Sequence, residues 1–443
     1  MNEPNNLPRA LDDGLTLRWA TAEDVEALAH FNVAMHSDDY ENDPEIWLAD
    51  WTRDLMSGRH PTTGPGDFTV VTDVAGAIIS SLCLISQNWQ YDGIPFAVGR
   101  PELIGTHPDY RRRGLVKRQM EIAHSLSAAR GELVQAITGI PWYYRRFGYE
   151  LALDRGGQRL LPYDRAQRLK RPDPDPFEVR PATEADLPLL QTLYAIFTAP
   201  FLVSRVRDAR ELHYEMCVAL ERTVNRRQFY VVQRRADGEP AGYFEFFTHP
   251  EGYYLREIAA RPGCSLRDVA LCAAHYLFRQ VVEKTPEGKP RPQIIFALGC
   301  RHHPAYDALP RLLQPDRAPF AWYVRVPDLR AFLRHIAPAL ERRLAGSVIA
   351  GFSGTLRLNL FTEHLALVFE QGRLKELGSF VPERLEAGDA TFPDLTFLHL
   401  LFGHRSLQEL RHAFADVGVR SEEAEVLLDV LFPSRPSAVI GLG

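Results

Sequence analysis

One stretch constrains the fold of this chain more than any other, because a predicted strand, a proline turn and a basic helix start follow one another directly. Residues 102–106 read as a short strand, and Pro108 ends it, since proline has no backbone N–H and a fixed φ. A helix with an apolar stripe then begins next to Gly114 and ends near Gly131. The stretch therefore predicts a strand–turn–helix unit.

This turn has the properties of an anion-binding site. The first turn of a helix leaves backbone N–H groups unpaired and carries a partial positive charge, which together favour a phosphate. Gly114 has no Cβ and allows the backbone to approach a ligand. The neighbouring cations are Arg111, Arg112, Arg113, Lys117 and Arg118. A basic helix start that only faces solvent is the alternative interpretation.

The same residues resemble the acetyl-CoA signature of the GNAT superfamily of N-acetyltransferases. That signature is a strand, then Val/Thr-x-Pro-x-Tyr-Arg, then Gln/Arg-x-x-Gly-x-Gly/Ala; residues 106–116 follow it, with Val116 in place of Gly or Ala. Residues 143–150 resemble the second family motif, Tyr-x-x-x-Gly-Phe/Tyr. The particular residues of both motifs are similar to those of Eis-type (enhanced intracellular survival) acetyltransferases.

The resemblance implies an α+β (mixed α/β) fold with two tandem GNAT-like domains, each around a mixed sheet, and a C-terminal sterol-carrier-protein-like domain. The expected boundaries are 1–160, 177–320 and 321–443, the last including the tail. An internal repeat supports this order, because 18–25 and 180–187 share Arg, Ala, Thr and Asp at an offset of 180 − 18 = 162 residues. The second copy lacks the basic Arg-x-x-Gly turn, so we expect it not to bind acetyl-CoA.

Periodicity places the other elements. In the first domain we expect a helix after Asp24, a turn at 88–94, and strands at 15–18, 68–72, 77–85 and 133–137. In the third domain we expect strands at 354–360 and 365–369, and helices at 395–402, 407–414 and 422–431. The apolar run 395–402 fits core packing or the lining of a lipid tunnel.

The resemblance also implies acetyl-CoA as co-substrate, with no metal. Strand backbone at Ile104, Gly105 and Thr106 would bind the pantetheine arm, and Gly139 and Ile140 would lie on the far side of the cofactor. The pyrophosphate would lie on Arg111, Arg112, Arg113, Gly114, Leu115, Val116 and Lys117. GNAT folds place a substrate wall after the first helix, where Asp38 and Asp39 could attract an amine or simply be solvated.

Direct acetyl transfer to an amine requires an acid for the leaving thiolate and a base for the amine proton. Tyr144 aligns with the tyrosine of the family motif and would be the acid; a core aromatic is the alternative. In Eis-type enzymes the C-terminal carboxylate acts as base. Here that group belongs to Gly443, where the family usually ends in an aromatic residue. Glu102 and a water relay are the other candidates.

Composition narrows the function classes. A length of 443 residues suggests about three domains. A net charge of −6 argues against a general nucleic-acid binder and favours cationic small molecules. The resemblance implies a small cationic or aminoglycoside-like amine as the acceptor. Five scattered cysteines have neither metal nor disulfide spacing, and no apolar signal or membrane-length run is present, so we expect a cytoplasmic protein.

Three further expectations concern partners and alternative functions. The resemblance implies a homo-oligomer, often a hexamer, with no nucleic-acid or membrane partner. A protein acetyltransferase acting on lysines or N-termini is one alternative to a small-amine enzyme. A non-catalytic member that binds a lipid or a protein is the other.

Overall fold

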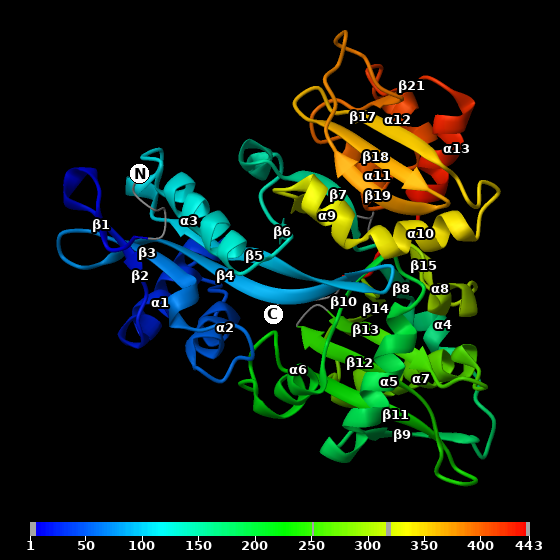
Figure 1. Cartoon of the computed structure of the whole chain (residues 1–443). Coiled ribbons are helices and arrows are strands. Elements are labelled where there is room, and N and C mark those ends of the chain that lie inside the picture. Colours follow the sequence, from blue (N-terminus) through cyan, green and yellow to red (C-terminus); the bar gives the residue numbers. More distant parts are fainter. Residues whose placement is uncertain (1–5, 250–251, 316–319, 440–443) are drawn as a thin grey trace.

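The computed structural model describes residues 6–249, 252–315 and 320–439. Its strands form three sheets, of nine, seven and five strands, and helices pack on each sheet (Figure 1). The expected α+β class is confirmed. Within the described ranges, no helix is long and apolar enough to cross a membrane.

The first sheet carries the predicted signature strand near its centre. Neighbouring strands in this sheet are antiparallel, except for β5 and β6, which are parallel. In spatial order the strands are β1 (Arg9–Ala10), β2 (Thr16–Trp19), β3 (Phe68–Thr72), β4 (Ile78–Tyr91), β5 (Ile94–Thr106), β6 (Val134–Ile137), β16 (Phe320–Arg325) and β7 (Glu150–Arg155). Its helices are α1 (Val25–His36), α2 (Trp47–Met56) and α3 (Leu115–Ala129).

Alternation along β4 places these helices on opposite faces of the sheet. Leu82 and Leu84 pack with Met120 of α3. Cys83 and Ile85 point the other way and pack with α1 and α2. The period of two that governs a strand thus separates the two layers.

The hairpin of β4 and β5 is longer than the sequence predicted, and the expected turn at 88–94 is wrong. Pairing continues through Trp89 and ends at Tyr91↔Ile94. The turn is the two-residue Asp92-Gly93, with φ values of 49° and 85°, as in a type I′ turn. Asn88 and Gln90 alternate with the buried Trp89 and Tyr91 and form the other face of the strand, and such polar residues resemble a loop when read alone.

The second sheet repeats the pairing pattern that runs from β2 to β6 in the first, with three antiparallel pairs and then a parallel one. Its spatial order is β15 (Gln314–Pro315), β8 (Arg159–Leu161), β14 (Gln293–Phe296), β13 (Gly252–Ala260), β12 (Pro240–His249), β11 (Gln228–Arg234) and β9 (Phe177–Pro181). Its helices are α4 (Tyr163–Gln167), α5 (Leu187–Thr198), α6 (Ala209–His213), α7 (Leu266–Lys284) and α8 (Pro304–Ala308).

Strands cross the expected domain boundaries. β8 belongs to the second sheet although it lies near the end of the expected first domain. β16, at the start of the expected third domain, lies between β6 and β7 of the first sheet. A third short strand, β10 (Val203–Arg205), pairs with β4 at Trp89–Tyr91 and also bridges Ala438 of the tail. The first sheet is therefore completed by strands from distant parts of the sequence.

The third sheet carries the C-terminal elements. Its order is β19 (Arg373–Gly378), β18 (His364–Glu370), β17 (Gly354–Asn359), β20 (Ala390–Thr391) and β21 (Gly418–Val419). Its helices are α9 (Leu329–His335), α10 (Ala337–Ala345), α11 (Phe397–Leu401), α12 (Leu407–Ala413) and α13 (Glu422–Leu431). The apolar residues of α11 are buried in a core that also contains Trp89 and Phe96 from the long hairpin.

Candidate active site

A cavity of about 990 Å³ lies between the end of β5, the start of α3 and the tyrosine-containing turn η5 (Tyr143–Phe147). It brings together most of the residues that the sequence singled out. Those lining it are Ile104, Gly105, Thr106, Arg111, Arg112, Gly114, Leu115, Val116, Lys117, Ile140 and Tyr144. The lining also includes Met35, His36, Tyr110, Tyr143, Arg146 and Phe147.

The cavity opens where two strands of the sheet part. β5 and β6 pair only at Val98↔Val134 and Gly99↔Gln135. A bulge follows in β5, marked by a register shift against β4 and by a φ of 51° at Leu103. A bulge bends its strand and redirects the backbone beyond it. The strand edge at 104–106 therefore faces the cavity instead of β6.

The start of α3 has an open backbone at the turn for which the sequence predicted anion binding. Gly114 is the N-cap of the helix with a φ of 74°, a left-handed conformation that glycine adopts without strain. A Cβ there would meet nothing within 4 Å, so the backbone lies open. Val116 also packs against the apolar cluster around Met120 and Tyr144, and its side chain can leave the backbone N–H accessible.

Of the predicted cations of the turn, Arg118 does not line the cavity, and Arg113 is turned toward other partners. Its guanidinium pairs with Asp13 at 2.9 Å and lies over the ring of Tyr110. Arg111 donates from Nε to the carbonyl of Thr106 at 3.3 Å. Arg111 and Arg112 line the cavity together with Lys117.

Tyr144 lies in the cavity wall within a cluster of aromatic rings. Its ring packs edge-on against those of Tyr143 and Tyr323, with centroids 5.2 and 5.6 Å apart, and it is 4% exposed. Gly139 adopts a φ of 130°, and a Cβ there would lie 3.7 Å from the Tyr144 hydroxyl. Burial, with a further contribution from Glu102, raises the pKa of Tyr144, so the phenol keeps its proton at neutral pH.

Glu102 does not line the cavity. Its carboxylate is buried and pairs with the fully buried Arg100, whose guanidinium lies 4.8 Å from the ring centroid of Trp322. Burial raises the pKa of Glu102 in spite of Arg100. This pairing, with an arginine two residues earlier on the same strand, makes Glu102 a structural ion-pair residue in this conformation.

The predicted acceptor acids lie outside the cavity as well. Asp38 and Asp39 are exposed, and Asp39 accepts hydrogen bonds from Asn42 at 3.0 to 3.2 Å. Gly443 lies outside the described residues. The tail is described as far as Val439, directly after the bridge between Ser204 and Ala438.

Met35 and His36, at the end of α1, form the cavity wall that sequence reasoning missed. Nε2 of His36 is shielded and finds no hydrogen-bond partner among the described residues. Burial lowers the pKa of His36, so its ring is neutral near pH 7. In the sequence these two residues only mark the end of a helix, and no motif distinguishes them.

Comparison with known proteins agrees with this geometry. Residues 16–152 match the model of the acetyltransferase (GNAT) domain family. The first domain is a GNAT acetyltransferase domain. This confirms the superfamily resemblance and the prediction that the chain is an enzyme of the N-acetyltransferase class. No curated protein matches the sequence.

Solved structures share the fold of this chain over nearly its whole length. A probable N-acyltransferase from Enterococcus faecalis V583 has 12% identity and a TM-score of 0.68, over 97% of this chain and 100% of its own. A GCN5-related N-acetyltransferase from Anabaena variabilis has 15% identity and a TM-score of 0.64, over 96% and 99%. Eis1 from Mycobacterium abscessus has 17% identity and a TM-score of 0.58, over 95% and 98%. The chain therefore has the overall fold of these proteins, Eis1 among them.

Proposed function

We propose that this chain transfers the acetyl group of acetyl-CoA directly to a primary amine. The observation that carries the proposal is the coincidence of three features in one cavity: an open strand edge at 104–106, a glycine-capped basic helix start, and a buried protonated tyrosine. A strand edge suits the amide groups of pantetheine, and a helix start suits a pyrophosphate. Few other ligands combine these two demands.

In this proposal the cofactor occupies the gap between β5 and β6. Its pantetheine arm pairs with the backbone of Ile104, Gly105 and Thr106, as a neighbouring strand would. The N–H groups of the first turn of α3 and the side chains of Arg112 and Lys117 hold the pyrophosphate. Gly139 and Ile140 close the other side of the gap, near Tyr144.

The chemistry then requires two proton transfers. The neutral amine attacks the thioester carbonyl, the C–N bond forms, and the C–S bond breaks. Tyr144 gives its proton to the departing sulfur, and a base takes the proton of the amine. We assign the base to the carboxylate of Gly443, as the resemblance implies. Glu102 is held by Arg100 outside the cavity, and Nε2 of His36 is shielded.

We further propose a small cationic amine, such as an aminoglycoside-like compound, as acceptor. None of the described residues that line the cavity is acidic. Attraction of a cation would therefore come from Asp38 and Asp39, the exposed acids close to the wall residue His36, or from the tail carboxylate.

Two further proposals concern the rest of the chain. The helix α7 of the second domain follows a turn without the basic motif, so this domain is proposed not to bind acetyl-CoA. The chain is also proposed to form a homo-oligomer.

The test is acetyl-CoA-dependent thiol release with a panel of polyamines, aminoglycosides and lysine peptides. Release with one small-amine class is the expected result, with acetyl-CoA binding measured separately by calorimetry. Release only with lysine peptides would instead identify a protein acetyltransferase. Acetyl-CoA binding without release for any amine would favour a non-catalytic binding protein.

A further inference from the structure

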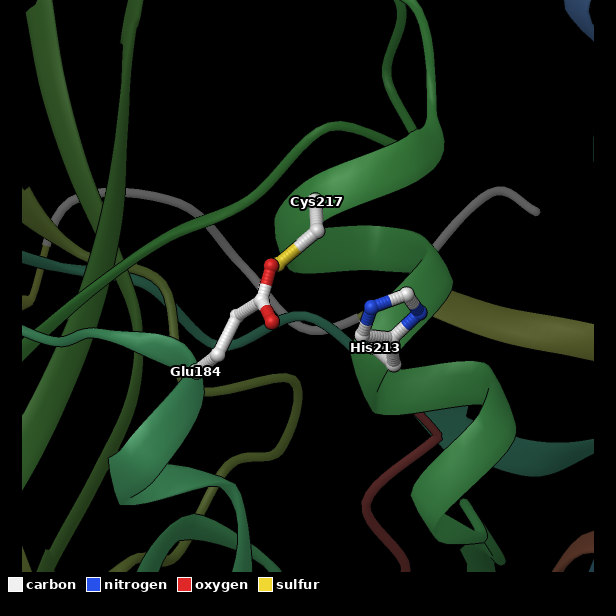
Figure 2. A group of neighbouring side chains, drawn as sticks. All are labelled: Glu184, His213 and Cys217. Atoms are coloured by element: carbon white, nitrogen blue, oxygen red, sulfur yellow. The ribbon is translucent and has the colours of Figure 1, made fainter.

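Three donor side chains from two segments of the second domain meet at one point. Glu184 begins the turn η6 (Glu184–Asp186), His213 ends α6, and Cys217 lies in the π-helical turn η7 (Tyr214–Val218). One oxygen, one nitrogen and the sulfur all lie within 4.8 Å of one another. Figure 2 shows the three side chains converging from the two ribbons. Among the described residues, this is the one group of three His, Cys, Asp or Glu side chains whose ligand atoms lie close enough together to hold a metal ion.

The carboxylate of Glu184 is not needed by the turn that carries it. Asp186 closes that turn by accepting from the N–H of Thr183 and pairing with Arg180 at 2.7 Å. The equivalent turn in the first domain has the same cap and the same 2.7 Å ion pair, with Ala22 at the position of Glu184. The repeated architecture thus forms without this acid, and Glu184 is available for another role.

The segment that carries His213 and Cys217 is anchored by contacts of the two residues between them, Tyr214 and Glu215. Tyr214 donates its hydroxyl hydrogen to the buried Asp54 of α2. Glu215 accepts from Arg207 at 2.7 Å inside the second domain. His213 and Cys217 are left on the half-buried side that faces Glu184. A π-helical turn often occurs where a protein positions side chains for a functional site.

The Cys217 sulfur and a carboxylate oxygen of Glu184 lie within 4.8 Å of each other. A divalent cation between the two groups would displace the thiol proton, because a metal-bound thiol is deprotonated.

We propose that Glu184, His213 and Cys217 form a zinc site, with a water molecule as fourth ligand. Zinc is bound by carboxylate, imidazole and thiolate together and prefers four ligands in a tetrahedron. On binding, the Cys217 thiol loses its proton to solvent, His213 binds through a neutral nitrogen, and no redox change occurs. The ion would join η6 to the α6–η7 segment, which docks on α2 through Tyr214.

The sequence suggested no metal because the three ligands do not form a motif. His213 and Cys217 are four residues apart on one helical face, whereas Glu184 comes from another element. Their convergence depends on how α5 and α6 pack together. The site lies outside the cofactor cavity, so acetyl transfer does not depend on it directly.

The experiment uses full-length, tag-free protein treated with a chelator and then dialysed. Zinc is titrated in competition with a chromogenic chelator, and cobalt is used as a spectroscopic probe. We expect one zinc per chain, and a thiolate-to-cobalt charge-transfer band with tetrahedral d–d bands. Cys217→Ser should abolish that band and weaken zinc binding more than about tenfold, since loss of a group that merely orients a ligand already weakens binding by 10- to 100-fold. Glu184→Ala should weaken zinc binding similarly.

The matched control is Cys264→Ser, which alters another half-buried cysteine of the same domain, in the apolar cluster around α7. This variant should bind zinc as the wild type does and keep the cobalt band. Near-UV circular dichroism of each metal-free variant verifies its fold. Absence of a stoichiometric zinc site in the wild type, or binding unchanged by both Cys217→Ser and Glu184→Ala, would overturn the proposal.

Discussion

The substitution Tyr144→Phe separates catalysis from folding, because the structure gives the hydroxyl no packing role. The ring stays among Tyr143, Tyr149 and Tyr323, and none of the described residues hydrogen-bonds the hydroxyl. We therefore expect the free energy of unfolding to change by less than about 1 kcal/mol. Loss of a general acid slows the reaction by roughly 10²- to 10⁴-fold, which corresponds to about 3 to 5 kcal/mol in activation free energy.

The assay is thiol release under saturating acetyl-CoA and amine, with thermal unfolding of each variant as the stability check. Tyr143→Phe is the matched control, since Tyr143 lines the same cavity in the same turn. It should keep kcat within about threefold of the wild type, because the ring and its packing are kept and Tyr143 has no part in the proposed proton transfers. The role of Tyr144 is refuted if its variant keeps wild-type kcat, or if both variants lose activity equally.

Four more outcomes follow. Gly114→Ala should lose about 1 to 2 kcal/mol of stability, because its φ is 74°, and should bind acetyl-CoA more weakly in calorimetry; Gly131→Ala, with a φ of 71° at the other end of α3, should lose similar stability but no affinity. Two glycines added after Gly443 displace the terminal carboxylate and should lower kcat about tenfold or more. His36→Asn should leave kcat within about threefold, because its Nε2 is shielded. Burial lowers the pKa of His60 to about 4, so the unfolded chain binds its proton first as pH falls from about 6.5; urea unfolding should show a loss of about 3 kcal/mol by about pH 4 that His60→Asn largely removes.

Most residues that line the cavity could be singled out from the sequence because their determinants are local. The turn from Thr106 to Gly114 needs only a proline, a cluster of arginines and one glycine in fixed order, and all are consecutive. The same holds for the turn around Tyr144. The repeat at 18 and 180 is equally visible, because its cap is made by residues within one turn.

Features that depend on the tertiary fold or on the geometry of a strand were not predicted. β16 is inserted between β6 and β7 only because Tyr323 pairs with Ile137 and Leu151, which are far away in the sequence. Glu102 reads as a free strand-end acid until the pleat brings Arg100, two residues earlier, against it. His36 reads as a helix end until β5 and η5 close around it. In each case the deciding partner comes from the tertiary fold or from strand geometry.

The most direct test of the central claim is acetyl transfer by the wild-type chain itself. Acetyl-CoA and each amine of the panel are incubated with the enzyme, and both free thiol and acetylated amine are quantified, the latter by mass spectrometry. The account predicts equal amounts of the two products with a small primary amine, and neither product when that amine is omitted. Acetyl-CoA that binds in the cavity but yields no acetylated product with any amine would contradict it.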